Sequence, residues 1–268
     1  MEITSKGLQS EFIFHGFGGV ITDHGDCISV LSPNNPDYYF GNFLLYPAPP
    51  KVGDFKHWTA RFAEIFGANT GVRHHTFQWI PGPETGTAAI DEFRQAGFTV
   101  DETSVLSTKT VSLDKPTPRG VEFRKIRTDV EWTAVVDSQS REGFPGVPMD
   151  DFRHYKETAF ANYRNMSEQG FGDWWGAFKS EKLVANMGLF FGQGVGRFQS
   201  VGTDPEHRRQ GICRAMVHHV SSEGLAAHPD VTLILHADAH DVARGIYCSV
   251  GYSEIEHLQS VFRAPILV

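Results

Sequence analysis

Apolar residues in the second half of the chain repeat with more than one spacing, which predicts helices and strands in the same half. From Asp150 to Glu168 they recur at steps of three and four, the spacing of a helix with one apolar face that packs on a core. A strand-like run at 121–126 and a helix at 131–142 precede it, separated from it by the loop at 143–149.

Three apolar runs follow that helix and predict an antiparallel meander. They cover 173–178, 183–191 and 195–203, with the turn-rich segments KSEK and GQGVG between them. The glycines at 192, 194 and 196 join strand to strand, so they indicate a hairpin turn and not a phosphate-binding loop. After the meander comes a helix that extends to about Ala226, then a buried-strand run at Val231–Ala237.

A proline-containing segment divides the chain. Residues 109–120 (KTVSLDKPTPRG) interrupt any regular pattern and predict a linker, so we expect domains at 1–115 and 116–268. Residues 89–98 in the first half have the same layout as 243–252 in the second, and an apolar strand at 75–80 precedes the first copy. The halves therefore look like an internal repeat.

Composition limits the classes of function. The chain has 268 residues, 40% of them hydrophobic, and a net charge of −8 with both halves mildly acidic. It has no Lys/Arg-rich run, which argues against nucleic acid and anionic membranes as partners. Neither a secretory signal nor a membrane-spanning stretch is evident, and three cysteines without a C-x-x-C pair read as reduced thiols, so we expect a cytoplasmic protein.

The strongest chemical signal is a basic, glycine-containing turn between a strand and a helix, VGTDPEHRRQGICRAM at 201–216. The first amides of a helix have no intrahelical acceptor and lie at the positive end of its dipole, and Gly211 allows a phosphate to approach closely. Arg208, Arg209 and Arg214 add charge around the same turn. The pattern predicts a diphosphate-bearing ligand.

This segment resembles the acetyl-CoA loop of the GNAT superfamily of N-acetyltransferases, Arg/Gln-x-x-Gly-x-Gly/Ala, with Arg208, Gly211 and Cys213 at its defined positions. Cys213 departs from the family's small residue. The resemblance implies a mixed α/β (α+β) tandem GNAT-like acyl-CoA N-acyltransferase fold, acetyl-CoA or another acyl-CoA as co-substrate, and no metal. It assigns these residues to the cofactor: Val201, Thr203, Arg208, Arg209, Gln210, Gly211, Ile212, Cys213, Arg214 and His240.

A second motif at 240–252 resembles the family's Asn-x-x-Ala-x-x-Leu/Ile-Tyr-x-x-x-Gly-Phe/Tyr, with His240 in place of Asn. In the family the helix tyrosine reaches the thioester sulfur, so Tyr247 is the candidate general acid. A phenol of pKa near 10 can protonate a departing thiolate whose conjugate acid has a pKa near 8.5. The resemblance also places the Val201 amide to stabilise the oxyanion. No motif identifies the general base, and His236 and Asp238 are the local candidates.

The first half lacks the signs of this chemistry. The segment matching the cofactor loop, at 46–53, contains three prolines, which have no amide to donate to a pyrophosphate. The helix at 54–66 follows it, and Phe93 stands where Tyr247 stands in the second half. We interpret residues 1–115 as a degenerate GNAT-like copy.

Alternatives remain open at this level. His236, Asp238 and His240 could hold zinc on one strand face, although a chance arrangement at a strand end explains them as well. The second half could sense acyl-CoA without turnover, or both halves could serve as a scaffold. For the enzyme, the acceptor is a small-molecule or peptide amine whose identity, like the acyl length and a homodimeric state, the sequence leaves open.

Overall fold

The computed structural model describes residues 1–67, 70–82, 86–144, 147–239 and 242–264. They form two compact units, one with Met1–Ser104 and the chain from Glu256 onward, the other with Val105–Ile255. Residues 109–121 contain no helix or strand, yet the unit boundaries differ from the predicted division at 115/116. They lie inside strands β5 (Thr99–Thr108) and β11 (Ser253–Arg263), because each strand begins in one unit and continues into the other. Within the described ranges, no helix has both the length and the apolar character needed to cross a lipid bilayer.

The first unit contains a mixed sheet in the order β1-β2-β3-β4-β11-β5. Its own strands are β1 (Val20–Asp23), β2 (Ile28–Leu31), β3 (Phe43–Tyr46) and β4 (His75–Trp79). Its helices are α1 (Lys6–Gly18), η1 (Tyr39–Gly41), α2 (Asp54–Phe66) and α3 (Thr87–Gln95). Strands β3 and β4 are parallel, whereas β11 pairs antiparallel with β4. The C-terminal strand therefore lies in the interior of this sheet.

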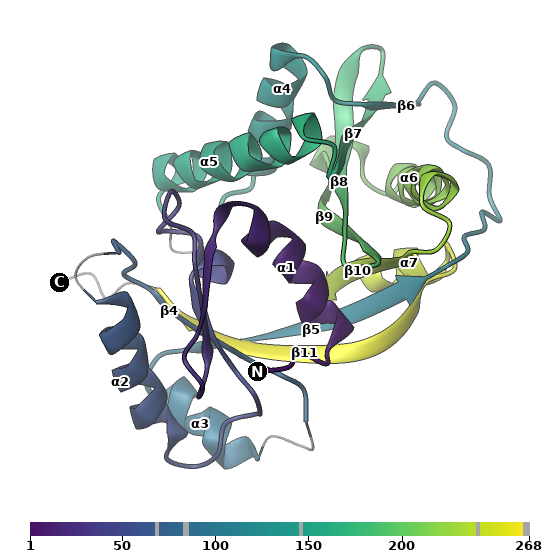
Figure 1. The fold of residues 1–268 in the computed structure, drawn as a ribbon. Coiled ribbons are helices and arrows are strands. Elements are labelled where there is room, and N and C mark those ends of the chain that lie inside the picture. The colour runs from purple at the N-terminus through teal and green to yellow at the C-terminus, as the bar shows by residue number, and fades with distance from the viewer. Residues whose placement is uncertain (68–69, 83–85, 145–146, 240–241, 265–268) are drawn as a thin grey trace. The chain divides into compact units, whose positions relative to one another are not determined.

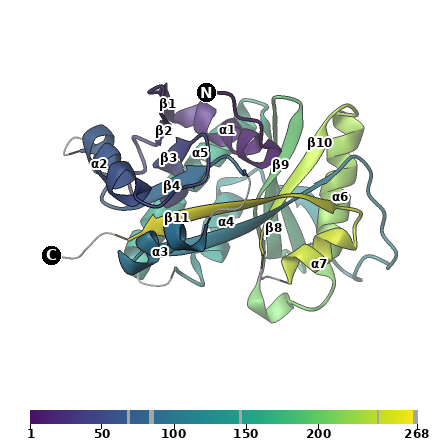
Figure 2. The same cartoon turned by 90° about the horizontal axis from the view of Figure 1, so that it is seen from below.

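Aromatic side chains form the core of the first unit between the sheet and helices α2 and α3. Phe77 and Phe93 are fully buried, and the Trp58 ring lies 5.8 and 5.7 Å from theirs. Helix α1 covers the other face of β4 and β11 (Figures 1 and 2). A pocket of about 40 Å³ on that face is lined by residues including Gln78 and Ser260. This volume suits a few water molecules and is far too small for an acyl-CoA.

The second unit has a sheet in the order β11-β5-β10-β9-β8-β7-β6. Its own strands are β6 (Glu122–Lys125), β7 (Gly172–Lys179), β8 (Lys182–Gly192), β9 (Val195–Thr203) and β10 (Thr232–Asp238). Its helices are α4 (Asp129–Ser140), α5 (Met149–Glu168), η2 (Pro205–His207), α6 (Ile212–Ala227) and α7 (Ala243–Cys248). Strands β7 to β9 form the predicted antiparallel meander, β6 pairs antiparallel with β7, and β10 adds in parallel to β9.

Two tight hairpins connect the meander. The central turn residues, 180–181 and 193–194, all have positive φ, at 49°, 63°, 52° and 77°. Turns with two such residues match the right-handed twist of paired strands and favour two-residue hairpins. The turn at 193–194 confirms the hairpin interpretation of that glycine-rich segment.

Two adjacent tryptophans on β7 show that helices cover both faces of this sheet. The fully buried Trp174 ring lies 4.8 Å from Phe160 and 5.2 Å from Tyr163 of α5, whereas Trp175 packs on His219 of α6 at 5.5 Å. Successive strand residues point to opposite faces. Helices α4 and α5 therefore lie on one side of the strands and α6 on the other (Figure 1).

The two units contain the same series of elements. The series strand, helix, parallel strand, helix, strand is formed by β3, α2, β4, α3 and β5 in the first half of the chain. It is formed again by β9, α6, β10, α7 and β11 in the second half. The two matching sequence segments correspond to α3 and α7, which occupy the same place in each series. This agrees with the predicted internal repeat.

Candidate functional site

Strand β9 is irregular where it approaches the predicted ligand loop. Its parallel pairing with β10 joins residues 195–197 to 232–234 and then stops, although both strands are described throughout. On its other edge, β9 has two residues between Gln199 and Gly202 where β8 has one. Ser200, within this β-bulge, has a φ of 48°. The end of β9 therefore departs from β10, and its backbone there takes no part in a ladder with β10.

The loop after β9 enters helix α6 through two left-handed residues, Arg209 with φ 61° and Gly211 with φ 76°. Gly211 is the N-cap, no side chain caps the helix, and the first turn contains no acidic residue. A Cβ at position 211 would lie 3.4 Å from an Arg214 nitrogen and would adopt a φ that side chains disfavour. The positive end of a 16-residue helix is thus left without a carboxylate of its own.

The corresponding helix start in the first unit, at α2, is already bound by carboxylates. The N-cap, Gly53, has a φ of 95°, and its amide donates to both carboxylate oxygens of Glu92 at 3.0 Å. Asp54 lies in the first turn and accepts from the Lys51 amide at 2.8 Å. An external anion here would meet two negative groups. Sequence reasoning attributed the loss of this site to prolines and missed Glu92, which directly precedes Phe93.

Arg208 does not point freely toward a ligand. Its Nε donates to the Thr203 carbonyl at 3.1 Å, and its terminal nitrogen forms an ion pair with Glu142 at 2.5 Å. The side chain therefore ties the loop to the end of β9 and to the segment after α4. Its first role in this structure is to hold the loop in shape.

Five of the other predicted cofactor residues, at positions 209, 210, 212, 213 and 214, lie at the start of α6 and differ in exposure. Arg209 and Gln210 are exposed, whereas Arg214 and Cys213 are half-buried. Ile212 is buried in the core beneath the helix, so only its backbone can face a ligand. Val201 and Thr203 on β9 are half-buried, and His240 lies outside the described residues.

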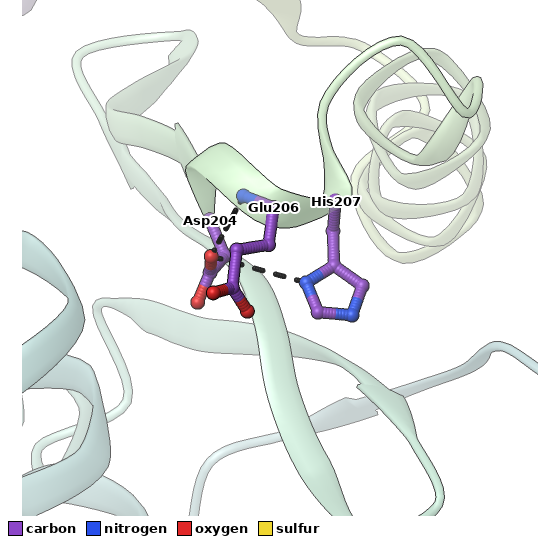
Figure 3. A group of neighbouring side chains, drawn as sticks. All are labelled: Asp204, Glu206 and His207. Carbon is purple, nitrogen blue, oxygen red and sulfur yellow. Dashed lines mark hydrogen bonds and ion pairs between the residues drawn. The ribbon is translucent and has the colours of Figure 1, made fainter.

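A buried carboxylate holds the loop between β9 and α6 in place. Asp204 is 4% exposed, accepts from the Glu206 amide at 3.1 Å and forms an ion pair with Arg141 of the α4 C-cap. Figure 3 shows its carboxylate directed at this amide and toward His207, whose Nδ1 is 3.8 Å away. Asp followed by Pro is a capping signature, which could have identified this residue from sequence.

The same three side chains, Asp204, Glu206 and His207, could in principle surround a metal ion. Both carboxylates already have cationic partners in the chain, since Arg141 pairs with Asp204 and Lys182 lies 3.7 Å from Glu206. We therefore interpret the group as part of the loop's own structure.

The candidate general acid, Tyr247, lies on α7 and is 3% exposed. It belongs to the same core cluster as Ile212 of α6 and Leu235 of β10, and α7 contacts α6. His236 is half-buried and Asp238 exposed, two residues apart on β10 and hence on one face of the strand. The sequence-predicted acid candidate thus lies on α7, which contacts α6, and the base candidates lie on β10, the strand that follows α6 in the chain.

Residues 135–262 match the family model of the acetyltransferase (GNAT) domain. Just under half of the chain is therefore similar to the acetyltransferase (GNAT) domain. No curated protein matches the sequence.

Solved structures share the fold over most of the chain. A functionally unknown conserved protein from Staphylococcus epidermidis has a TM-score of 0.74 at 15% identity, covering 93% of this chain and 96% of its own. A GCN5-related N-acetyltransferase from Kribbella flavida has a TM-score of 0.65 at 14% identity, covering 98% and 95%. A tandem GNAT protein from the clavulanic acid biosynthesis pathway has a TM-score of 0.54 at 12% identity, covering 80% and 70%. The chain thus has the mixed α/β fold of GNAT proteins, tandem ones included.

Proposed function

We propose that the second unit transfers an acetyl group from acetyl-CoA to a primary amine, by direct attack while both substrates are bound. The observation that carries this proposal is the contrast between two helix starts. At α2 the amide of the N-cap is bound by Glu92, whereas α6 has no acidic residue in its first turn and no side-chain cap. One helix start accepts an external pyrophosphate and the other is closed to it, so the chain binds one acyl-CoA.

Different residues bind the pyrophosphate and the pantetheine chain of acetyl-CoA. Amides at the start of α6, with Arg209 and Arg214 nearby, bind the pyrophosphate. The backbone of Val201 and Thr203, on the part of β9 that leaves β10, binds the pantetheine chain as an added strand would. Acetyl-CoA supplies the activated thioester carbonyl.

The reaction needs three groups from the protein. As the amine nitrogen bonds to the acetyl carbon, the carbonyl oxygen gains negative charge, and the Val201 amide donates to it. When the carbon–sulfur bond breaks, Tyr247 gives its proton to the departing thiolate. Before attack, the ammonium must lose a proton, since a lysine-like amine has a pKa near 10.4. His236 and Asp238 are the candidates for accepting it, through water.

The degenerate copy in the first unit follows from the same comparison. The first unit keeps the series of strands and helices but has Phe93 in place of the tyrosine and Glu92 in place of an external anion. We interpret it as a GNAT-like fold that no longer binds acyl-CoA.

Calorimetry on the full chain tests the cofactor site. Acetyl-CoA should bind at one site per chain, and Gly211→Leu should abolish binding, because a side chain at φ 76° strains the loop and fills the anion site. Gly194→Leu is the matched control, since Gly194 has a φ of 77° with open space around it in the β8–β9 hairpin. Loss of binding in both variants, or in neither, would refute the assignment.

Amine-dependent thiol release then tests catalysis. Tyr247→Phe keeps the buried ring and removes the proton donor, so turnover should fall by about 10²–10⁴-fold while acetyl-CoA affinity is unchanged. The second candidate function, an acyl-CoA sensor without turnover, is favoured by the absence of any carboxylate among residues 195–203 of β9. Tight binding with no thiol release for any class of amine would establish the sensor instead.

A further inference from the structure

A polar side chain of α4 holds the bulge in β9. Gln139 donates through Nε2 to the Ser200 carbonyl at 2.8 Å and to Asn186 Oδ1 at 2.8 Å. Gln139 is half-buried, and Asn186, on β8, is fully buried. The bulged peptide is therefore tied to a neighbouring helix and strand by one amide group.

A network behind Gln139 fixes its orientation. Asn186 also accepts from Trp174 Nε1 at 3.2 Å and donates to Ser138 Oγ at 3.2 Å. Because Asn186 has bonds on both its oxygen and its nitrogen, its amide cannot rotate without breaking one of them. The oxygen that receives Gln139 is thus held in place, and Gln139 with it.

The residue after the bulge makes room for this contact. A Cβ on Gly202 would lie 2.9 Å from Gln139 Nε2, closer than real Cβ contacts occur. Glycine at this position therefore permits the Gln139 side chain to lie against the bulged strand.

Gln139 acts on a particular peptide group. The Ser200 carbonyl and the Val201 amide belong to one peptide unit, and in a trans peptide the two point in opposite directions. Fixing the carbonyl toward α4 directs the Val201 N–H away from α4. Val201 has no register partner on β8, nor on β10, across strands that are described throughout.

We infer that Gln139 is a positioning residue for the oxyanion donor, an inference that rests on the proposed acyl transfer. It sets the direction of the Val201 N–H, and it strengthens that donor because a hydrogen bond to a peptide carbonyl polarises the whole unit. Asn186 and Trp174 hold Gln139 in the orientation this requires.

The test uses the full chain with Gln139→Met, which keeps the side-chain length and removes both hydrogen bonds. Removing an oxyanion donor outright costs about 10²–10³-fold in kcat, so misdirecting one should cost about 10- to 100-fold. If Gln139 acts only through the Ser200–Val201 peptide, acetyl-CoA affinity by calorimetry and KM for the amine should change less than about twofold. Ser138→Ala is the matched control, since it trims the far end of the network and leaves both Gln139 bonds intact.

An infrared measurement gives a readout that does not depend on turnover. With acetyl-CoA carrying carbon-13 at the carbonyl, binding to the wild type should lower the carbonyl stretching frequency, as donation from the Val201 amide weakens the double bond. Gln139→Met should lose at least half of this shift and Ser138→Ala should keep it. Equal shifts in the wild type and Gln139→Met would overturn the inference.

Failure of the positioning role and failure of the proposed transferase give different results in these experiments. Binding with a Gln139-dependent carbonyl shift but no thiol release would support the positioning role and refute the proposed transferase. Thiol release that is the same in the wild type and Gln139→Met would refute the positioning role alone. No binding of acetyl-CoA by the wild type would refute both.

Discussion

Replacing Asp204 with alanine should lower the free energy of unfolding by about 2 kcal/mol. Two interactions are lost. The carboxylate caps the short helix η2 by accepting from the Glu206 amide, and loss of such a cap costs about 1 kcal/mol. The charge-assisted bond from Arg141 contributes about 1 kcal/mol more, a value kept low because the Arg141 side chain is 48% exposed and screened by water.

The pH dependence of this effect follows from the surroundings of Asp204. Burial alone would raise the pKa of its carboxyl, but hydrogen bonds from Arg141 and from the Glu206 amide outweigh burial, so the pKa lies below 3.8. A carboxyl with a lowered folded-state pKa stabilises the protein above its unfolded pKa, near 4, and this stabilisation disappears as the pH falls through the folded pKa. Asp204→Asn should therefore be about 1 kcal/mol less stable than the wild type at pH 7 and approach it below pH 4.

Urea unfolding of the full chain at pH 7 and at steps down to pH 3 measures both effects. Glu206→Gln is the control, because its carboxylate is 77% exposed and 3.7 Å from Lys182, so its loss should change stability by less than about 0.5 kcal/mol. The reasoning fails if Asp204→Ala costs no more than Glu206→Gln, or if the gap between the wild type and Asp204→Asn is independent of pH.

Two further substitutions test packing and capping, each by urea unfolding. Ser221→Ala should lower the free energy of unfolding by about 1–3 kcal/mol, because the buried Tyr252 hydroxyl loses its partner at 2.8 Å. Adding Tyr252→Phe should recover part of this loss in a double-mutant cycle. Thr128→Ala should cost about 1 kcal/mol by removing the side-chain half of the capping box of α4, whereas Thr133→Ala on the exposed side of that helix should cost less than half as much.

Local sequence patterns predicted the parts of the fold that local physics determines. The helix at 54–66, the helix at 150–168 and the three strands of the meander all lie within two residues of the predicted bounds. The turn from β9 into α6 was also predictable, because Gly211 and the arginines around it are adjacent in sequence. The pairing of β11 (253–263) with β4 was not predictable. It joins residues almost 200 positions apart, and no period in the sequence encodes such a partner.

The site was predictable only where its residues are close in sequence. Gln139 donates to Ser200, 61 positions away in the sequence, and to Asn186, 47 positions away, so no local motif contains these contacts. Glu92 was within the recognised repeat, yet its role depends on α3 lying beside the start of α2, which is a tertiary relationship. The left-handed φ of Ser200 likewise depends on the register of β8 against β9 and not on serine itself.

The placement of residues 256–263 has a consequence for synthesis on the ribosome. Strand β11 lies between β4 and β5 in the sheet of the first unit, so residues 1–104 leave the ribosome without an interior strand of their own sheet. At about 5–20 residues per second, roughly 10–30 s pass before that strand is made. During this time β4 presents an unpaired edge of buried aromatic residues, and the N-terminal half, although synthesised first, cannot be the first half to finish folding.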